Sequence, residues 1–222
     1  MSGKDKIRKF RENESFKCLI QPPMDEMLRG DHPLKGHWNE QIFGNSNPIV
    51  VELGCGKGEY TIALAQRNPN INYIGVDIKG ARLWKGAKFA TENNMGNVAF
   101  LRTRIDFIGS IFGPDEISEI WITFADPQPK KPRKRLTHPL FLDRYRGFLK
   151  KGGIVNLKTD SQLLHEFTIE TAESLGLEII EKNADIYGSG RVTDGDILSV
   201  KTFYESMFLK EGKPITYTAF RL

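Results

Sequence analysis

The stretch VELGCGKGEY, residues 51–60, decides the fold of this chain. An apolar run at 48–53 predicts a buried strand that ends in this stretch, and helical spacing of apolar residues follows at 59–67. Glycines at positions 54, 56 and 58 allow a sharp turn and a close approach of a ligand to the backbone. The free amide groups of the following helix face the same crevice. The stretch therefore predicts a ligand site at the carboxyl end of the first strand.

Apolar runs and amphipathic segments alternate outward from this stretch. Strands are predicted at 48–53, 73–76, 98–101, 117–124 and 154–157, and helices at 59–67, 81–93, 139–149 and 162–175. The segments 177–180, 201–209 and 215–220 are predicted as closing strands. Strand–helix alternation indicates an α/β fold with a doubly wound, mostly parallel sheet, and the final strands indicate an antiparallel edge pair. Ligands of such a sheet lie beyond the carboxyl ends of the strands.

Composition and charge limit the possible functions of the protein. The 222 residues carry a net charge of +4, with five basic residues between positions 4 and 11 and five more between 130 and 135. Two such clusters indicate a polyanionic partner, although the first could also be an ordinary solvated tail. The two cysteines have no metal-ligand spacing, and no apolar segment resembles a signal peptide or a membrane span. We expect a basic arm and lead at 1–47, a catalytic domain at 48–222, no metal, and a cytoplasmic location.

The glycine-rich turn is compatible with two ligand chemistries. A dinucleotide site would place its last glycine at position 59, but Glu59 stands there and would repel a pyrophosphate. The pattern Glu52-x-Gly54-x-Gly56-x-Gly resembles the first motif of class I S-adenosylmethionine-dependent methyltransferases, whose cofactor carries an ammonium group that a carboxylate favours. Asp77, at the end of the second strand, is placed to accept hydrogen bonds from a ribose diol. Glu52 could alternatively be a buried acid neutralised by a local partner.

A second motif, FADPQPKKPRKR, occupies residues 124–135, after the fourth strand. Pro127 and Pro129 stiffen the backbone and hold Asp126 over the crevice. Five cations follow within six residues, a density that indicates a binding segment. The alternative is an ordinary surface turn, in which Asp-Pro starts the turn and the lysines serve solubility. Gln128 and Pro129 differ from the Pro-aromatic pair that methyltransferases of exocyclic adenine or cytosine amines carry here, which argues against that subclass.

This second motif resembles the Phe-Pro-Asp-Pro-Trp-Pro-Lys-Lys signature of the bacterial tRNA (guanine-N7)-methyltransferases. The resemblance extends over residues 48–210 and includes the motif at 51–60, Asp77, Lys158-Thr159-Asp160 and Thr202-Phe203-Tyr204-Glu205. It departs where Ala125 and Gln128 replace the family's Pro and Trp. It also departs at Arg104-Ile105-Asp106, where the family has an Asp-Ala pair.

The resemblance implies a role for each matching residue. Asp126 would be the active-site acid and would also lie near the cofactor. The implied cofactor-binding residues are Glu52, Gly54, Gly56 and Asp77, with Asp106 taking over the contact near the adenine. The implied tRNA-binding residues are Lys130, Asp160, Thr202, Phe203, Tyr204 and Glu205.

Guanine N7 has an unprotonated lone pair at neutral pH, so its methylation needs no catalytic base. A carboxylate such as Asp126 can stabilise the positive charge that develops on the purine. The resemblance therefore implies transfer of a methyl group from S-adenosylmethionine to N7 of a guanine in tRNA, in the variable loop. Two alternatives remain: a methyltransferase for a small molecule or a protein, and a non-catalytic RNA-binding module of the same fold. No obligate protein partner is evident.

Overall fold

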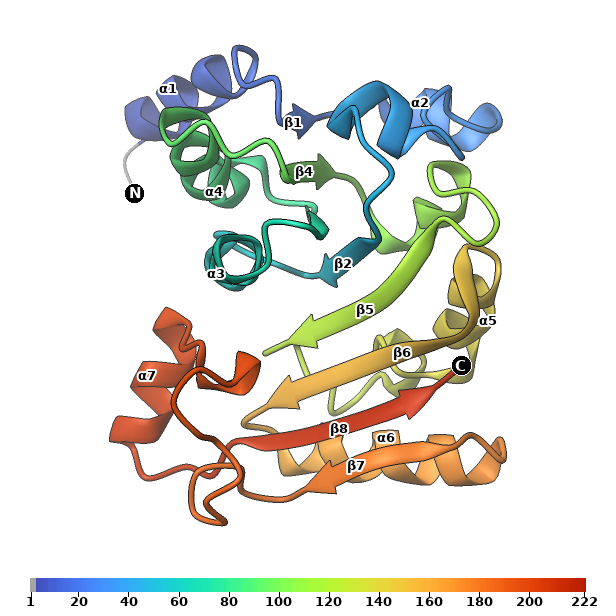
Figure 1. The fold of residues 1–222 in the computed structure, drawn as a ribbon, viewed down its shortest axis with the longest axis vertical. Coiled ribbons are helices and arrows are strands. Elements are labelled where there is room, and N and C mark those ends of the chain that lie inside the picture. Colours follow the sequence, from blue (N-terminus) through green and yellow to red (C-terminus); the bar gives the residue numbers. More distant parts are fainter. Residues whose placement is uncertain (1–2) are drawn as a thin grey trace.

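A computed structural model of the protein describes residues 3–222, so the first two residues of the predicted lead lie outside the described residues. Within that range the strands form one eight-stranded sheet in the order β1-β4-β3-β2-β5-β6-β8-β7. Their bounds are β1 Leu19–Ile20, β2 Ile49–Leu53, β3 Asn72–Asp77, β4 Val98–Arg102, β5 Ile117–Thr123, β6 Leu149–Thr159, β7 Ile179–Asn183 and β8 Thr216–Arg221. Neighbours pair in parallel except β8, which is antiparallel to β6 and β7 and runs opposite to β6 in Figure 1. The predicted doubly wound sheet with an antiparallel edge is confirmed.

Helices cover both faces of this sheet. The α-helices are α1 Gly3–Asn13, α2 Met24–Arg29, α3 Glu59–Arg67, α4 Gly80–Glu92, α5 Pro139–Arg146, α6 Gln162–Ser174 and α7 Phe203–Lys210. Short helical turns lie at Asn39–Phe43, Ile105–Ser110, Pro132–Lys134 and Ile197–Ser199. No helix among the described residues is long and apolar enough to cross a membrane.

The core follows the two-residue period of the strands. Val51 and Leu53 of β2 belong to an apolar cluster that includes side chains of α2, α5 and α6. Val50, directly before Val51 in the chain, belongs to a second cluster that includes side chains of α3 and α4. The same alternation recurs in β3 and β4, so the sheet separates two apolar layers and its carboxyl edge stays free for a site.

The residues ahead of β2 join this core. β1 pairs in parallel with β4, and α1 packs on α4, which it lies beside in Figure 1. Asn13 at the end of α1 donates a hydrogen bond to the carbonyl of Gly80 over 2.9 Å. Trp38 has no exposed surface, and its Nε1 donates to the carbonyl of Ile111 over 2.9 Å. The lead thus contributes a strand, helices and a large buried side chain to the same body.

One predicted element is wrong. The segment 201–209, expected as a strand, forms helix α7 instead. Thr202 caps this helix: its hydroxyl accepts from the backbone N–H of Glu205, while the Glu205 carboxylate accepts from the backbone N–H of Thr202. This reciprocal cap satisfies two amide groups of the first turn and outweighs the strand preference of the aromatic residues. The antiparallel edge is therefore built by β7 and β8. The helix predicted at 139–149 also ends early, at Arg146, because Leu149 begins β6.

Candidate functional site

The loop after β2 has the geometry that its glycines predicted. Gly54, Gly56 and Gly58 have φ values of 77°, 58° and 72°, in the left-handed region that favours glycine. A Cβ at Gly54 or Gly56 would meet no heavy atom within 4 Å, so both face open space. A Cβ at Gly58 would clash with the ring of Phe100, which has no exposed surface. The first two glycines therefore border a cavity, whereas the third makes room for the core.

Glu52, near the end of β2, is buried beneath this loop with 4% of its surface exposed. One carboxylate oxygen accepts hydrogen bonds from the backbone N–H and the hydroxyl of Thr61, and the other accepts from the hydroxyl of Thr123 over 2.5 Å. Burial raises the pKa of Glu52 to about 7, with a further upward contribution from the charge of Asp77, although these hydrogen bonds oppose the shift. Glu52 thus has local partners and also lines a cavity, so both roles considered for it are compatible with the structure.

Asp77, the last residue of β3, fixes the same loop. Its carboxylate accepts from the backbone N–H of Gly56 over 3.0 Å and from that of Lys79 over 2.7 Å. Asp77 also lines a cavity of about 700 Å³ beyond the carboxyl ends of the strands, together with Gly54. Carboxylate oxygens offer about four acceptor positions, so Asp77 can still accept from a ligand hydroxyl.

Asp106, for which the resemblance implies a place near the cofactor, lies on the wall of this larger cavity. Its carboxylate pairs with Arg104 over 3.2 Å and with Arg144 over 3.5 Å. The rest of the wall mixes apolar, uncharged polar and basic side chains: Ile78, Thr103, Ile105, Gln128, Arg133, Lys134, Leu136, Leu140 and Phe141. The volume lies within the range of ~300–1,000 Å³ that ligand sites usually have.

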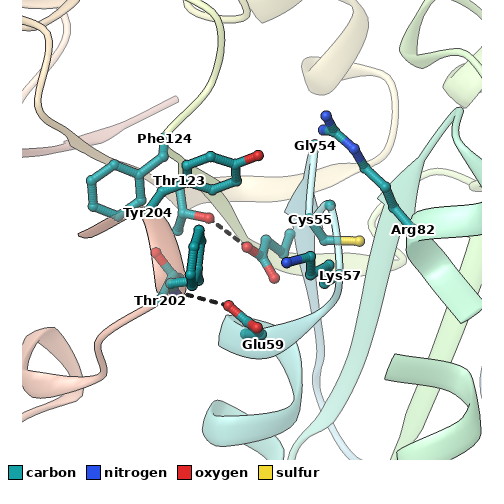
Figure 2. Close-up of a pocket in the computed structure, with 12 residues that line it drawn as sticks. Gly54, Cys55, Lys57, Glu59, Arg82, Thr123, Phe124, Thr202 and Tyr204 are labelled. Atoms are coloured by element: carbon teal, nitrogen blue, oxygen red, sulfur yellow. Dashed lines mark hydrogen bonds between the residues drawn. The ribbon is translucent and has the colours of Figure 1, made fainter. Parts of the chain in front are cut away.

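A smaller cavity of about 80 Å³ lies beside the larger one, and Gly54 lines both. Figure 2 shows Arg82 on one side of it and Phe124 with Tyr204 on the other. The start of α7 reaches this cavity because the backbone N–H of Phe203 donates to Glu59 of α3 over 2.9 Å. Phe203 and Tyr204 are more than 40% exposed, at 57% and 44%. Two accessible aromatic rings therefore stand at the mouth of the site.

Asp126 follows β5, between Phe124 of the smaller cavity and Gln128 of the larger. Its side chain is exposed, and one carboxylate oxygen accepts from the backbone N–H of Gln128 over 3.0 Å. Phe124 and Gln128 have φ values of 49° and 47°, which residues other than glycine rarely adopt. Strain of this kind collects at functional sites, where the surroundings must hold it.

The predicted tRNA-contacting residues fall into two groups. Lys130 is exposed, and Asp160, half-buried at the end of β6, has a pKa that burial raises. Glu205 has no exposed surface, and its carboxylate is taken up by Lys158 over 2.7 Å and by the hydroxyl of Tyr187 over 2.7 Å. Glu205 therefore cannot reach a tRNA in this conformation, and what it does in the structure is position α7.

Sequence reasoning missed the partner of this acid. Lys158 is also fully buried, and its Nζ donates to the carbonyls of Leu198 and Val200 over 2.7 and 3.0 Å. Burial lowers the pKa of Lys158, while Glu205 counteracts the shift. The motif at 158–160 contained the signal, since a lysine inside an apolar strand is rarely buried without a partner.

No cluster of three or more His, Cys, Asp or Glu side chains suited to a metal ion occurs between residues 3 and 222. The organic cofactor is better matched. Two backbone positions open to the cavity and two strand-end carboxylates form a surface that suits a ligand with an ammonium group and a ribose.

Comparison with known proteins identifies the family. A family model described as "Putative methyltransferase" matches residues 46–218. A tRNA (guanine-N(7)-)-methyltransferase from Christiangramia forsetii is 49% identical, with all of both chains covered. The enzyme of that name from Bacteroides thetaiotaomicron is 46% identical over 99% of this chain and 86% of its own. The chain belongs to the tRNA (guanine-N7)-methyltransferase family.

A more divergent relative of the same name, from Bacillus subtilis, is 34% identical over 82% of this chain and 83% of its own. Among solved structures, the 16S rRNA methyltransferase KamB superposes with a TM-score of 0.64 at 12% identity, covering 86% of this chain and 95% of its own. At that identity the likeness shows only the shared fold. The predicted family resemblance is confirmed.

Proposed function

We propose that this protein transfers a methyl group from S-adenosylmethionine to N7 of a guanine in tRNA. The observation that carries the proposal is the arrangement at one sheet edge of a cavity lined by Asp77 and Asp106, the active-site acid Asp126, and a row of exposed cations. The family resemblance further points to a guanine of the variable loop, in a cytoplasmic tRNA.

The cofactor would lie across the carboxyl ends of β2 and β3. Glu52 would favour its ammonium group, Asp77 its ribose hydroxyls, and Gly54 and Gly56 would let it approach the backbone. Asp106 would lie toward the adenine, at the far wall of the larger cavity. When bound, S-adenosylmethionine supplies a methyl group on a positively charged sulfur.

Asp126 would act on the purine rather than on a proton. Guanine N7 is already a nucleophile at neutral pH, so the residues of the site need only orient the base and stabilise its developing positive charge. The exposed carboxylate of Asp126 is fixed by the amide of Gln128, and the chain on either side of it lines the two cavities through Phe124 and Gln128. A preorganised charge at this position stabilises the transition state more than the ground state.

Lys130, Arg133 and Lys134 are exposed and would bind tRNA phosphates, which gives affinity without sequence information. Phe203 and Tyr204 would contact the substrate at the mouth of the smaller cavity. Their rings offer a stacking surface, which the family's tryptophan would not supply here because Gln128 replaces it.

The decisive experiment is nucleoside analysis of unmodified tRNA after incubation with the protein and S-adenosylmethionine. We expect 7-methylguanosine, at a single position in the variable loop when the product is mapped. A protein that binds the methyl donor but leaves tRNA unmethylated would favour a small-molecule or protein substrate. A protein that does not bind the methyl donor in a calorimetric titration would be a non-catalytic module.

A further inference from the structure

Arg135 differs from the other four cations of its cluster. Lys130, Lys131, Arg133 and Lys134 are exposed, whereas Arg135 has 6% of its surface exposed. From the sequence alone, all five residues are expected to bind phosphates. A side chain withdrawn from solvent is poorly placed to bind a phosphate, so Arg135 requires a different explanation.

The contacts of Arg135 tie the active-site loop to the body of the protein. Its Nε donates a hydrogen bond to the carbonyl oxygen of Pro127 over 3.0 Å. Its guanidinium carbon lies 4.4 Å from the ring centroid of Phe167, on α6. The planar guanidinium is suited to stacking on a ring while it donates at its edge. Its backbone N–H donates to Pro132 over 3.0 Å, which fixes the turn that carries it.

Pro127 directly follows Asp126, so this hydrogen bond holds the peptide beside the active-site acid. The opposite end of the loop is held by the backbone N–H of Phe124, which donates to the carbonyl of Lys158 over 2.9 Å. The left-handed conformations of Phe124, at the first anchor, and Gln128, directly after the second, cost free energy and persist only where the surroundings enforce them. Without the Arg135 anchor, the loop would relax and move the carboxylate.

We propose that Arg135 is a positioning residue, which holds the carboxylate of Asp126 through the Pro127 carbonyl and does not bind tRNA phosphate. This inference rests on the proposed function, because the position of Asp126 matters only if the base is methylated there. Misplacing a catalytic group by about 1 Å can reduce the rate roughly 10²-fold. In this cluster the four exposed cations are then available to bind tRNA, and the buried Arg135 positions the active-site loop.

The test compares Arg135→Lys with Arg133→Met, its exposed neighbour. Arg135→Lys keeps the charge over Phe167 but removes the planar Nε donor. We expect its single-turnover methylation rate at saturating tRNA to fall by about 10–10²-fold. In Arg135→Met, which removes the charge, the slope of tRNA affinity against salt concentration should stay unchanged. Arg133→Met should instead flatten this slope by ~0.7–0.9 for the phosphate contact it loses. Lys150→Met, at the exposed amino end of β6, serves as the charge-loss control with a wild-type rate.

A second variant keeps the inference testable if Arg135→Lys is unstable. Phe167→Leu removes the ring beneath the guanidinium without altering any charge, and it should lower the same rate while leaving the salt slope intact. Thermal melting and cofactor titration report whether each variant is folded. A wild-type rate in both Arg135→Lys and Phe167→Leu, or a flattened salt slope in Arg135→Met, would overturn the inference. A wild-type protein that leaves tRNA unmethylated would instead overturn the proposed function.

Discussion

The buried pair of Lys158 and Glu205 allows a quantitative prediction. Both side chains have no exposed surface, and their charged atoms lie 2.7 Å apart. At an effective dielectric constant of 20 their attraction is ~6 kcal/mol, but desolvation costs several kcal/mol for each ion and cancels much of it. Removing one partner leaves the other charge uncompensated, so Lys158→Met and Glu205→Gln should each lower the free energy of unfolding by about 3–5 kcal/mol.

The double variant separates this charge effect from lost packing. In Lys158→Met/Glu205→Gln no ion remains buried, and the glutamine amide oxygen can still accept from the hydroxyl of Tyr187. The carbonyls of Leu198 and Val200 lose their donor, so some destabilisation should persist. The double variant should therefore cost about 2 kcal/mol less than the sum of the two single variants.

Denaturant unfolding of all four proteins gives the free energies, provided that the m-value stays constant. In thermal melts each single variant should lose about 6–20 °C, given roughly 2–4 °C per kcal/mol for a domain of this size. Additive single variants, or a cost below ~1 kcal/mol for either, would refute the reasoning that the two charges depend on each other. Tyr187→Phe, which removes only a hydroxyl donor to Glu205, provides a milder matched comparison.

Three further predictions concern the cofactor and the active-site acid. Gly56→Val should weaken cofactor binding at least ~10-fold in calorimetry, because a branched side chain would enter the cavity from a left-handed backbone, whereas Gly96→Val at an exposed turn should not. Cofactor affinity should fall by up to ~10-fold per pH unit below about pH 7, because Glu52 is protonated at those pH values and must lose its proton when it binds an ammonium group. This pH dependence should vanish in Glu52→Gln. Asp126→Asn should lower the single-turnover rate by about 10²–10³-fold at saturating tRNA, and a loss confined to tRNA affinity would show that the acid acts only in the ground state.

Local pattern was sufficient for most of the sheet but not for the connection between β7 and β8. The apolar run of β5 and the acid-ended strand β3 form strands, as their residues predicted. The segment 201–209 is rich in aromatic and aliphatic residues, which favour a strand by propensity alone. The cap signature Thr202-x-x-Glu205 stood in the same segment and indicates a helix start. A capping box satisfies specific amide groups, so it outweighs a propensity that depends on packing.

Burial of single polar residues could not be predicted, because it depends on partners distant in the chain. Arg133 and Arg135 occupy equivalent places in the sequence motif, yet only Arg135 meets the ring of Phe167 on another element. Glu205 was expected at the substrate, whereas its partner Lys158 lies on the central strand β6. The burial of a single charged residue therefore cannot be predicted from a motif alone.

The three glycines of the first motif show that one pattern can answer two different physical demands. All three adopt left-handed backbone, which explains why the residue type recurs at alternate positions. Only Gly54 and Gly56 open onto space that a ligand can fill, whereas Gly58 accommodates the buried ring of Phe100. Gly75 and Gly86, outside the motif, accommodate the same ring. The glycines of the motif thus meet two requirements, space for a ligand and packing of β4 against α3 and α4. The two requirements coincide because the turn that leaves space for the ligand also brings the helix onto the sheet.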